Sequence, residues 1–267
     1  MINFSKGHAY GNDFLYVLSR DVPAARLDRL AQEMCDRHTG VGADGLIVYE
    51  LTSEGASMRL FNADGGRAEV SGNGVRALGA LLLRDDHRPQ ADLDVATEGG
   101  IKRLTRMSRE DTRQMFRAFM GVPSDVRRLT VDVASEAVDL VVLDMGNPQA
   151  IILGPLPDDV RFQRIGSALE RHRTFREGTN VEFAHVEAPD RVRIRIWERG
   201  VGPTLSSGTG SCASLVAAAA FGGASKDAAV ISPGGSQRVE WLEDGVYLTG
   251  WAEIVCDGQW LRPLPGV

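Results

Sequence analysis

The chain has 267 residues, which corresponds to about two domains at roughly 150 residues each. Its 43% hydrophobic and 25% charged residues are ordinary for a globular protein and exclude a disordered, collagen-like or coiled-coil chain. The formal net charge is −6 and there is no long run of basic residues, so nucleic acid is not an expected partner. Glycine is in excess, at 30 residues, which indicates many tight turns.

No segment suggests a membrane or export. The longest apolar stretches, such as residues 215–221, fall short of the ~20 residues that a membrane helix needs. The first residues lack the basic and apolar regions of a signal peptide. Cys35, Cys212 and Cys256 are too few and too far apart for a disulfide framework or a Cys-rich metal site. We therefore expect a cytoplasmic protein with thiols rather than disulfides and no membrane partner.

Helix and strand patterns alternate along the chain. Strands are predicted at 46–49, 58–61, 181–183 and 192–197, and helices at 25–37, 75–83, 162–172 and 212–221. A cluster of helix breakers at 121–124 predicts a boundary between an N-terminal lobe, 1–121, and a C-terminal lobe, 122–256. Residues 257–267 would form a tail that could return to the first lobe.

The second half of the chain repeats landmarks of the first at an offset of 135 or 136 positions. The matching pairs are Gly11-Asn12 with Gly146-Asn147, Gly42-Ala43-Asp44 with Gly178-Thr179-Asn180, Phe61-Asn62 with Trp197-Glu198, Ser71-Gly72-Asn73-Gly74 with Ser207-Gly208-Thr209-Gly210, and Gly99-Gly100 with Gly234-Gly235. A glycine-rich chain can produce accidental pairs, but the flanking strand patterns agree too. The sequence therefore predicts one lobe, duplicated.

Each repeat carries Ser-Gly-x-Gly just before a predicted helix. The glycines let backbone N–H groups approach a ligand, and a helix start carries partial positive charge, so such a loop suits a carboxylate or phosphate. A plain serine helix cap would explain either loop alone. Because the loops form a symmetric pair, we expect Ser71 and Ser207 to face each other across an interlobe cleft. Such a pair suits inversion of a carbon beside a carboxylate, which needs a base on one face and an acid on the other.

Eight blocks between about residue 4 and residue 258 resemble the signature blocks of the diaminopimelate epimerase family. They are His8-Ala9-Tyr10-Gly11-Asn12-Asp13-Phe14, Gly40-Val41-Gly42-Ala43-Asp44, Phe61-Asn62-Ala63-Asp64-Gly65, Gly72-Asn73-Gly74-Val75-Arg76, Met145-Gly146-Asn147-Pro148, Gly178-Thr179-Asn180-Val181, Glu198-Arg199-Gly200 and Ser207-Gly208-Thr209-Gly210. The resemblance implies an α/β (α+β) fold with two pseudo-symmetric lobes, each a curved, mostly antiparallel sheet around a central helix. It also implies a cytoplasmic homodimeric isomerase that needs no cofactor and converts LL- to meso-diaminopimelate in lysine biosynthesis.

The same resemblance assigns roles to individual residues. It places Ser71 and Ser207 at the two catalytic positions, and it implies substrate binding by Asn12, Asn62, Gly72, Asn73, Asn147, Asn180, Glu198, Arg199, Gly208 and Thr209. The backbones of the two glycine loops would hold the reacting carboxylate. The asparagines, together with Glu198 and Arg199, would hold the distal end of the amino acid. Taken singly, the asparagines could be turn residues, and Glu198 and Arg199 a surface ion pair.

The chain departs from the family pattern at the catalytic positions. The family has cysteines where this sequence has Ser71 and Ser207, a histidine where it has Gln149, and often a proline where it has Trp251. A thiol, with a pKa of about 8.5, is readily tuned into an acid or a base, whereas a serine hydroxyl needs a neighbouring base. The binding positions are kept, so the pattern favours retained substrate binding with altered chemistry.

The sequence supports three hypotheses. The first is an amino-acid epimerase that uses the serine pair. The second is an isomerase of the same fold with a single non-thiol base, Glu198 or His8, and the third is a catalytically silent protein that binds an amino acid. Glu69 is expected in a solvated position and Cys212 buried in a helix. The histidines show no ligand spacing, so no metal site is predicted.

Overall fold

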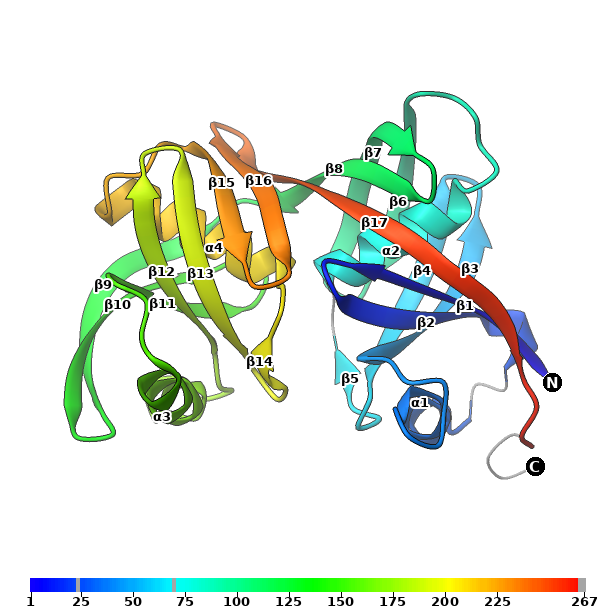
Figure 1. Cartoon of the computed structure of the whole chain (residues 1–267), viewed down its shortest axis with the longest axis horizontal. Coiled ribbons are helices and arrows are strands. Elements are labelled where there is room, and N and C mark those ends of the chain that lie inside the picture. The colour runs from blue at the N-terminus through cyan, green and yellow to red at the C-terminus, as the bar shows by residue number, and fades with distance from the viewer. Residues whose placement is uncertain (23–24, 69–70, 264–267) are drawn as a thin grey trace. The chain divides into compact units, whose positions relative to one another are not determined.

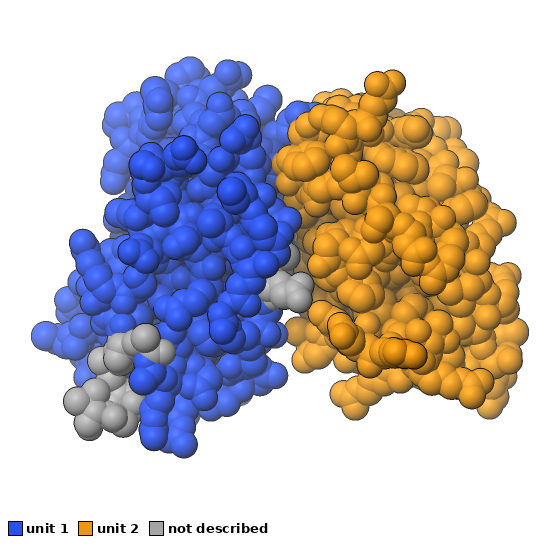
Figure 2. Space-filling view, turned by 180° about the vertical axis from the view of Figure 1, so that it is seen from behind, with its two compact units in different colours: residues 1–118, 250–267 blue, residues 119–249 orange. Residues whose placement is uncertain are grey.

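The computed structural model describes residues 1–22, 25–68 and 71–263, so Glu69 lies outside the described residues. The chain divides into two compact units, coloured separately in Figure 2: unit 1 is Met1–Ala118 with Gly250–Val267, and unit 2 is Phe119–Thr249. The sequence placed these divisions after residues 121 and 256. The return to unit 1 begins earlier, at Gly250, because it occurs inside one long strand whose pairing partner changes along its length.

Unit 1 is formed mainly by the helices and strands of the first half of the chain (Figure 1). Its elements are β1 (Ile2–Ala9), β2 (Asn12–Leu18), a short 3-10 turn η1 (Ser19–Asp21), α1 (Leu27–Cys35), β3 (Gly45–Thr52), β4 (Gly55–Asn62), β5 (Arg67–Ala68), α2 (Gly72–Leu82), β6 (Ala91–Thr97), β7 (Gly100–Glu110) and most of β8 (Arg113–Gly121). Neighbouring strands pair antiparallel, with parallel pairing at β2–β3 and β4–β6. The second part of β17 (Gly245–Trp260) completes the unit by pairing with β1.

Unit 2 has the same order of elements. They are β9 (Ser124–Val133), β10 (Glu136–Asp144), β11 (Pro148–Leu153), α3 (Asp159–Glu170), β12 (Asn180–Ala188), β13 (Arg191–Glu198), β14 (Gly202–Thr204), α4 (Gly208–Phe221), β15 (Asp227–Ser232) and β16 (Gly235–Leu242). The first part of β17 pairs with β16, and parallel pairing occurs at β11–β12 and β13–β15.

The two units repeat each other in register. The parallel pair β2–β3 aligns Phe14 with Gly45, and β11–β12 aligns Gln149 with Asn180, which are 135 positions later in both strands. The helices α2 and α4 begin 136 positions apart. The α+β fold with sheets and helices in repeated order, predicted from the sequence, is confirmed.

Helices pack on both faces of each sheet because strand side chains alternate between faces. In β2, Leu15 and Val17 join the core that contains α1, while the Tyr16 hydroxyl donates to Gly74 O in α2 at 2.9 Å. A matching core under α3 includes Phe162 and Ile165. Helix α4 is buried on nearly every side and packs against strands β10 to β13, β15 and β16, so it forms the centre of its unit (Figure 1).

The predicted strands lie within β3, β4, β12 and β13, and the predicted helices within or across α1 to α4. The helices α2, α3 and α4 begin three or four residues earlier than predicted, because Ser71, Asp158 and Ser207 cap their first turns. Cys35 and Cys212 are buried thiols and Cys256 is exposed. Within the described ranges, no helix is both long and apolar enough to cross a membrane.

Candidate active site

A serine caps the glycine-loop helix in each unit. Ser71 has an extended backbone (φ −127°, ψ 119°), and its Oγ accepts a hydrogen bond from Gly74 N at 3.1 Å. Ser207 has nearly the same backbone (φ −136°, ψ 129°) and accepts from Gly210 N, also at 3.1 Å. The serine caps that either loop alone would suggest are therefore present in both units. A hydroxyl that accepts a bond from the backbone keeps its own hydrogen to donate.

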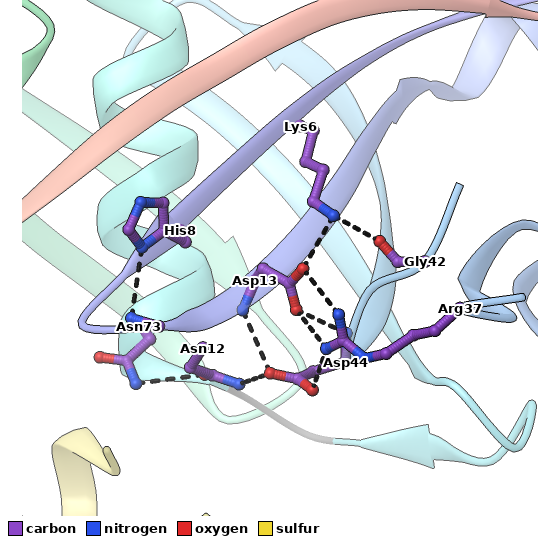
Figure 3. Close-up of polar contacts among 9 residues, drawn as sticks. Lys6, His8, Asn12, Asp13, Arg37, Gly42, Asp44 and Asn73 are labelled. Atoms are coloured by element: carbon purple, nitrogen blue, oxygen red, sulfur yellow. Dashed lines mark hydrogen bonds and ion pairs between the residues drawn. The ribbon is translucent and has the colours of Figure 1, made fainter. Parts of the chain in front are cut away.

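Asn12, at the start of β2, links the first turn of α2 to Asp44, the residue before β3. Its Nδ2 donates to Asp44 Oδ2 at 2.8 Å, and its Oδ1 accepts from Asn73 Nδ2 at 3.1 Å (Figure 3). The Asn73 Oδ1 in turn accepts from the guanidinium of Arg76, which is buried in α2. Two predicted binding residues, Asn12 and Asn73, are thus brought together beside Ser71. The amide chain fixes the orientation of both.

The Asp44 carboxylate that accepts from Asn12 belongs to an ion cluster that the sequence does not predict (Figure 3). The Asp13 carboxylate lies 3.0 Å from Lys6 Nζ and 2.7 Å from Arg37 Nη2, and Arg37 also contacts Asp44 Oδ1 at 2.8 Å. Burial alone would raise the pKa of Asp13, but the hydrogen bonds from Arg37 and Lys6 outweigh it and lower the pKa. Asp13 therefore remains charged at neutral pH and anchors the loop that carries Asp44.

Replacing Asp13 with asparagine is expected to lower the free energy of unfolding at pH 7 by about 2 kcal/mol, because charge-assisted bonds to two cations are lost. A lowered pKa stabilises the fold above the ordinary value of 3.8, and this contribution is lost as pH falls through the lowered pKa. Urea unfolding from pH 7 to pH 3 measures both effects, and the difference between the two proteins should shrink as pH falls below 3.8.

The control is Asp94→Asn, which removes an ion pair with Arg103, a side chain that is 72% exposed. An exposed pair contributes at most about 1 kcal/mol. If the two variants lose the same stability, the Asp13 cluster is an ordinary surface network.

The corresponding contacts in unit 2 are built from different side chains. Thr209 Oγ1 lies 3.5 Å from Ser207 Oγ and 3.5 Å from Asn147 Nδ2. Asn147 Oδ1 is 2.6 Å from Gln149 Nε2. The structure thus brings the predicted residues Asn147, Thr209 and Ser207 together, and Gln149, which departs from the family pattern, joins them.

Beyond Gln149 lies Glu182 of β12, which the sequence did not single out. Its side chain is fully buried, and a methyl group on Gly210 would approach its Oε1 to 2.5 Å, so the carboxyl group lies directly against the α4 loop. Burial, and secondarily the charge of Glu198, raise the pKa of Glu182 well above its ordinary value. Burial therefore favours the protonated form of the Glu182 carboxyl group.

The remaining predicted residues lie at strand ends. Asn180 is buried at the start of β12, where its Nδ2 donates to Pro148 O at 3.1 Å and its Oδ1 accepts from Arg199 N at 3.0 Å. Glu198 ends β13 and Asn62 ends β4, both half-buried. The contacts of Asn180 are those of a residue that orders a turn, and they place Arg199 beside it.

His8 and Trp251 form an aromatic cluster in unit 1. The His8 ring meets the Trp251 ring edge-on at 5.2 Å, and its Nδ1 accepts from Gly11 N at 3.2 Å. Trp251 also packs on Tyr10 at 4.6 Å and lies under the Arg113 guanidinium at 4.5 Å. His8 therefore packs as an ordinary turn residue. Its contacts orient the ring without requiring a catalytic role.

The fold is similar to those of two solved structures, a probable racemase and a predicted epimerase. It matches a probable proline racemase from Agrobacterium radiobacter K84, with a TM-score of 0.77 and 16% identity over 100% of this chain and 95% of that one. It also matches a predicted epimerase from Pseudomonas aeruginosa, with a TM-score of 0.78 and 11% identity over 98% and 100% of the two chains. At these identities the likeness concerns the fold.

Sequence relatives identify the family. The family model described as Diaminopimelate epimerase matches residues 4–124 and 141–255. A diaminopimelate epimerase of Desulforudis audaxviator is 38% identical over 98% of this chain and 100% of its own length. One of Synechococcus elongatus is 37% identical over 96% and 97% of the two. The chain belongs to the diaminopimelate epimerase family.

Proposed function

We propose that this protein is an amino-acid epimerase that inverts an α-carbon of diaminopimelate, with Ser71 and Ser207 as the two acid/base residues. The observation that carries the proposal is that both serines cap equivalent helices with the same geometry, each Oγ accepting a 3.1 Å bond from a backbone N–H. Such N–H groups and the helix start favour a developing negative charge on the serine oxygen.

In the proposed reaction, one serine first loses its hydroxyl proton to water, and the resulting alkoxide takes the α-proton. The other serine hydroxyl delivers its proton to the opposite face of the α-carbon and regains one from water. The backbones at Gly72 and Asn73 and at Gly208 and Thr209 would hold the reacting carboxylate, since glycine loops at helix starts suit an anion. The asparagines at 12, 62, 147 and 180, together with Glu198 and Arg199, would hold the rest of the amino acid. A serine acts as a base only when its own proton is stabilised elsewhere, so the polar neighbours of each serine decide the rate.

A second candidate is amino-acid binding without catalysis. It is favoured by the capping bonds themselves, because a hydroxyl engaged in a cap is already fully explained by helix stability. A one-base isomerase that uses Glu198 or His8 is a third candidate. The turn and ring contacts of His8 make Glu198 the better base of these two.

Incubation of the purified protein with separate stereoisomers of diaminopimelate in deuterated water distinguishes these candidates. The proposal predicts deuterium at the α-carbon and conversion between stereoisomers, measured by NMR and chiral chromatography. Binding in a calorimeter without exchange would instead support the silent protein. Exchange without inversion would support a one-base isomerase. A cytoplasmic location and a homodimeric assembly are part of the proposal and are checked by fractionation and light scattering.

A further inference from the structure

We propose that Glu182 is a positioning residue for Ser207: through Gln149 and Asn147 it turns the Thr209 hydroxyl toward the Ser207 oxygen. The four links of this relay are short or moderate contacts within unit 2. They are Glu182 to Gln149 at 3.1 and 3.2 Å, Gln149 to Asn147 at 2.6 Å, Asn147 to Thr209 at 3.5 Å, and Thr209 to Ser207 at 3.5 Å. In its catalytic consequence the inference rests on the proposed function, but the relay itself can be tested without substrate.

The direction of the relay depends on the proton of Glu182. In one sense of the relay, Gln149 Nε2 donates to Asn147 Oδ1 and Asn147 Nδ2 donates to Thr209 Oγ1. This sense turns the Gln149 amide oxygen toward Glu182, so it requires a protonated Glu182 that donates its O–H to that oxygen. The Thr209 hydrogen is then directed at Ser207 Oγ, which also accepts from Gly210 N. Two hydrogen-bond donors directed at one serine oxygen stabilise its deprotonated form, which is the form that acts as a base.

An ionised Glu182 would reverse every link. A carboxylate only accepts, so both amides would turn over and Gln149 would donate to Glu182 at the same 3.1 and 3.2 Å distances. Thr209 would then donate toward Asn147, and one of the two donors to Ser207 would be lost. The amide geometry accommodates either sense, so the protonation state of one buried carboxyl group selects between them.

The surroundings of Glu182 favour the neutral form. Glu182 faces the uncharged Gln149 of β11, the backbone of the first turn of α4 at Gly210, and the negative charge of Glu198 at the end of β13. Full burial and this like charge both penalise a carboxylate. These surroundings therefore favour the sense of the relay that a protonated Glu182 sets.

The repeat in unit 1 provides an internal contrast. A methyl group on Gly74, the equivalent of Gly210, would meet Ile47 Cδ1 at 2.7 Å and Phe14 Cε2 at 3.6 Å. Apolar side chains thus lie under the Ser71 loop where Glu182 and Gln149 lie under the Ser207 loop. Asn73, which occupies the place of Thr209, has no hydroxyl to offer. The two serines are therefore unequal, and Ser207 is the better supported base.

The first test uses Glu182→Gln and Glu182→Leu with side-chain amide NMR at pH 7. Glutamine can still donate to Gln149, so Glu182→Gln should keep the Gln149 and Asn147 amide resonances near their wild-type positions, whereas leucine should move both. Ile47→Val, a packing change under the other loop, is the matched control and should move neither. If the glutamine and leucine variants behave alike, whether unchanged or both shifted, the relay is refuted.

The second test is the pH dependence of stability. Because the pKa of Glu182 is raised in the folded state, the wild type loses stability as pH rises above the ordinary value of 4.5, toward the raised pKa. Glu182→Gln has no proton to lose, so its advantage in melting temperature should grow between pH 5 and pH 9. A constant difference between the two proteins would mean that folded Glu182 is already ionised, which would overturn the proposed direction.

The catalytic consequence is tested by exchange kinetics. Glu182→Leu should lower kcat about 10- to 100-fold with a smaller change in KM, because the serine is misdirected while the binding residues remain. Glu182→Gln should restore most of kcat and remove the loss of activity at high pH. Equal kinetics for all three proteins would show that the relay has no catalytic role. Absence of exchange in the wild type would refute the proposed function instead, and the NMR result would still decide the relay.

Discussion

Replacing Ser71 and Ser207 together with cysteine is expected to raise the rate of α-proton exchange by about 100-fold or more. Both positions lie at helix starts beside backbone N–H donors, where a thiolate is stabilised far more easily than an alkoxide. General acid–base contributions of about 10²- to 10⁴-fold are typical when the acid and base are matched to the working pH. Deuterium incorporation into diaminopimelate, followed by NMR, measures the gain.

Gln149→His, added to the double cysteine variant, tests whether the relay must change when the acid/base residues change from hydroxyls to thiols. Gln149 lies 2.6 Å from Asn147, so a histidine there would disturb the amide links while supplying a titratable ring. If neither the double nor the triple variant gains activity over the wild type, missing thiols are not what limits the rate.

Alanine at either serine is expected to reduce inversion at least about 100-fold while leaving slow exchange from one stereoisomer. Each serine faces one side of the substrate in the proposed reaction, so the remaining serine can still remove and return a proton on its own side. Ser71→Ala and Ser207→Ala should therefore retain exchange with opposite stereoisomers. Chiral chromatography of deuterated product measures this. Loss of exchange with the same stereoisomer in both variants would favour a single base.

Loss of a helix cap is a separate effect that needs its own control. Either alanine variant removes a capping bond and should lower stability by about 1 kcal/mol. Asp158 caps α3 in the same way, accepting from Arg161 N at 2.7 Å, but α3 carries none of the proposed catalytic residues. Asp158→Ala should thus match the serine variants in stability and the wild type in exchange. Reduced exchange in this variant would mean that the serine effects are structural.

Much of the fold could be predicted because it depends on local patterns that recur. The helix that follows Ser207 is rich in alanine and other small residues, and β13 alternates apolar with basic side chains. Each element can therefore be predicted from its own short stretch of sequence. The duplication could be found because its glycines occur where turns need them, as at Gly11 and Gly146, which share a φ of 86°. The return of the chain to unit 1 could not be predicted, because β17 changes its pairing partner from β16 to β1 without a break in the strand.

The candidate site was only partly predictable. Ser71, Ser207, Asn12 and Asn147 were visible as motif residues, and the structure brings each into a polar cluster of its own unit. Glu182 is not predicted because the run Val181-Glu182-Phe183 indicates only a strand. A charged residue inside a buried strand was the available signal, since such residues are rarely fully buried without a partner. Its partner, Gln149, is 33 positions away in the sequence and adjacent only through the parallel pairing of β11 with β12.

The most direct test of the central claim is the conversion of pure LL-diaminopimelate by the wild type and by the double variant Ser71→Ala, Ser207→Ala, followed by chiral chromatography. We expect the wild type to convert the LL isomer to a mixture of LL- and meso-diaminopimelate, and the double variant to stay at the uncatalysed background although it still binds. Wild-type conversion no faster than that of the double variant would refute the proposed epimerase activity.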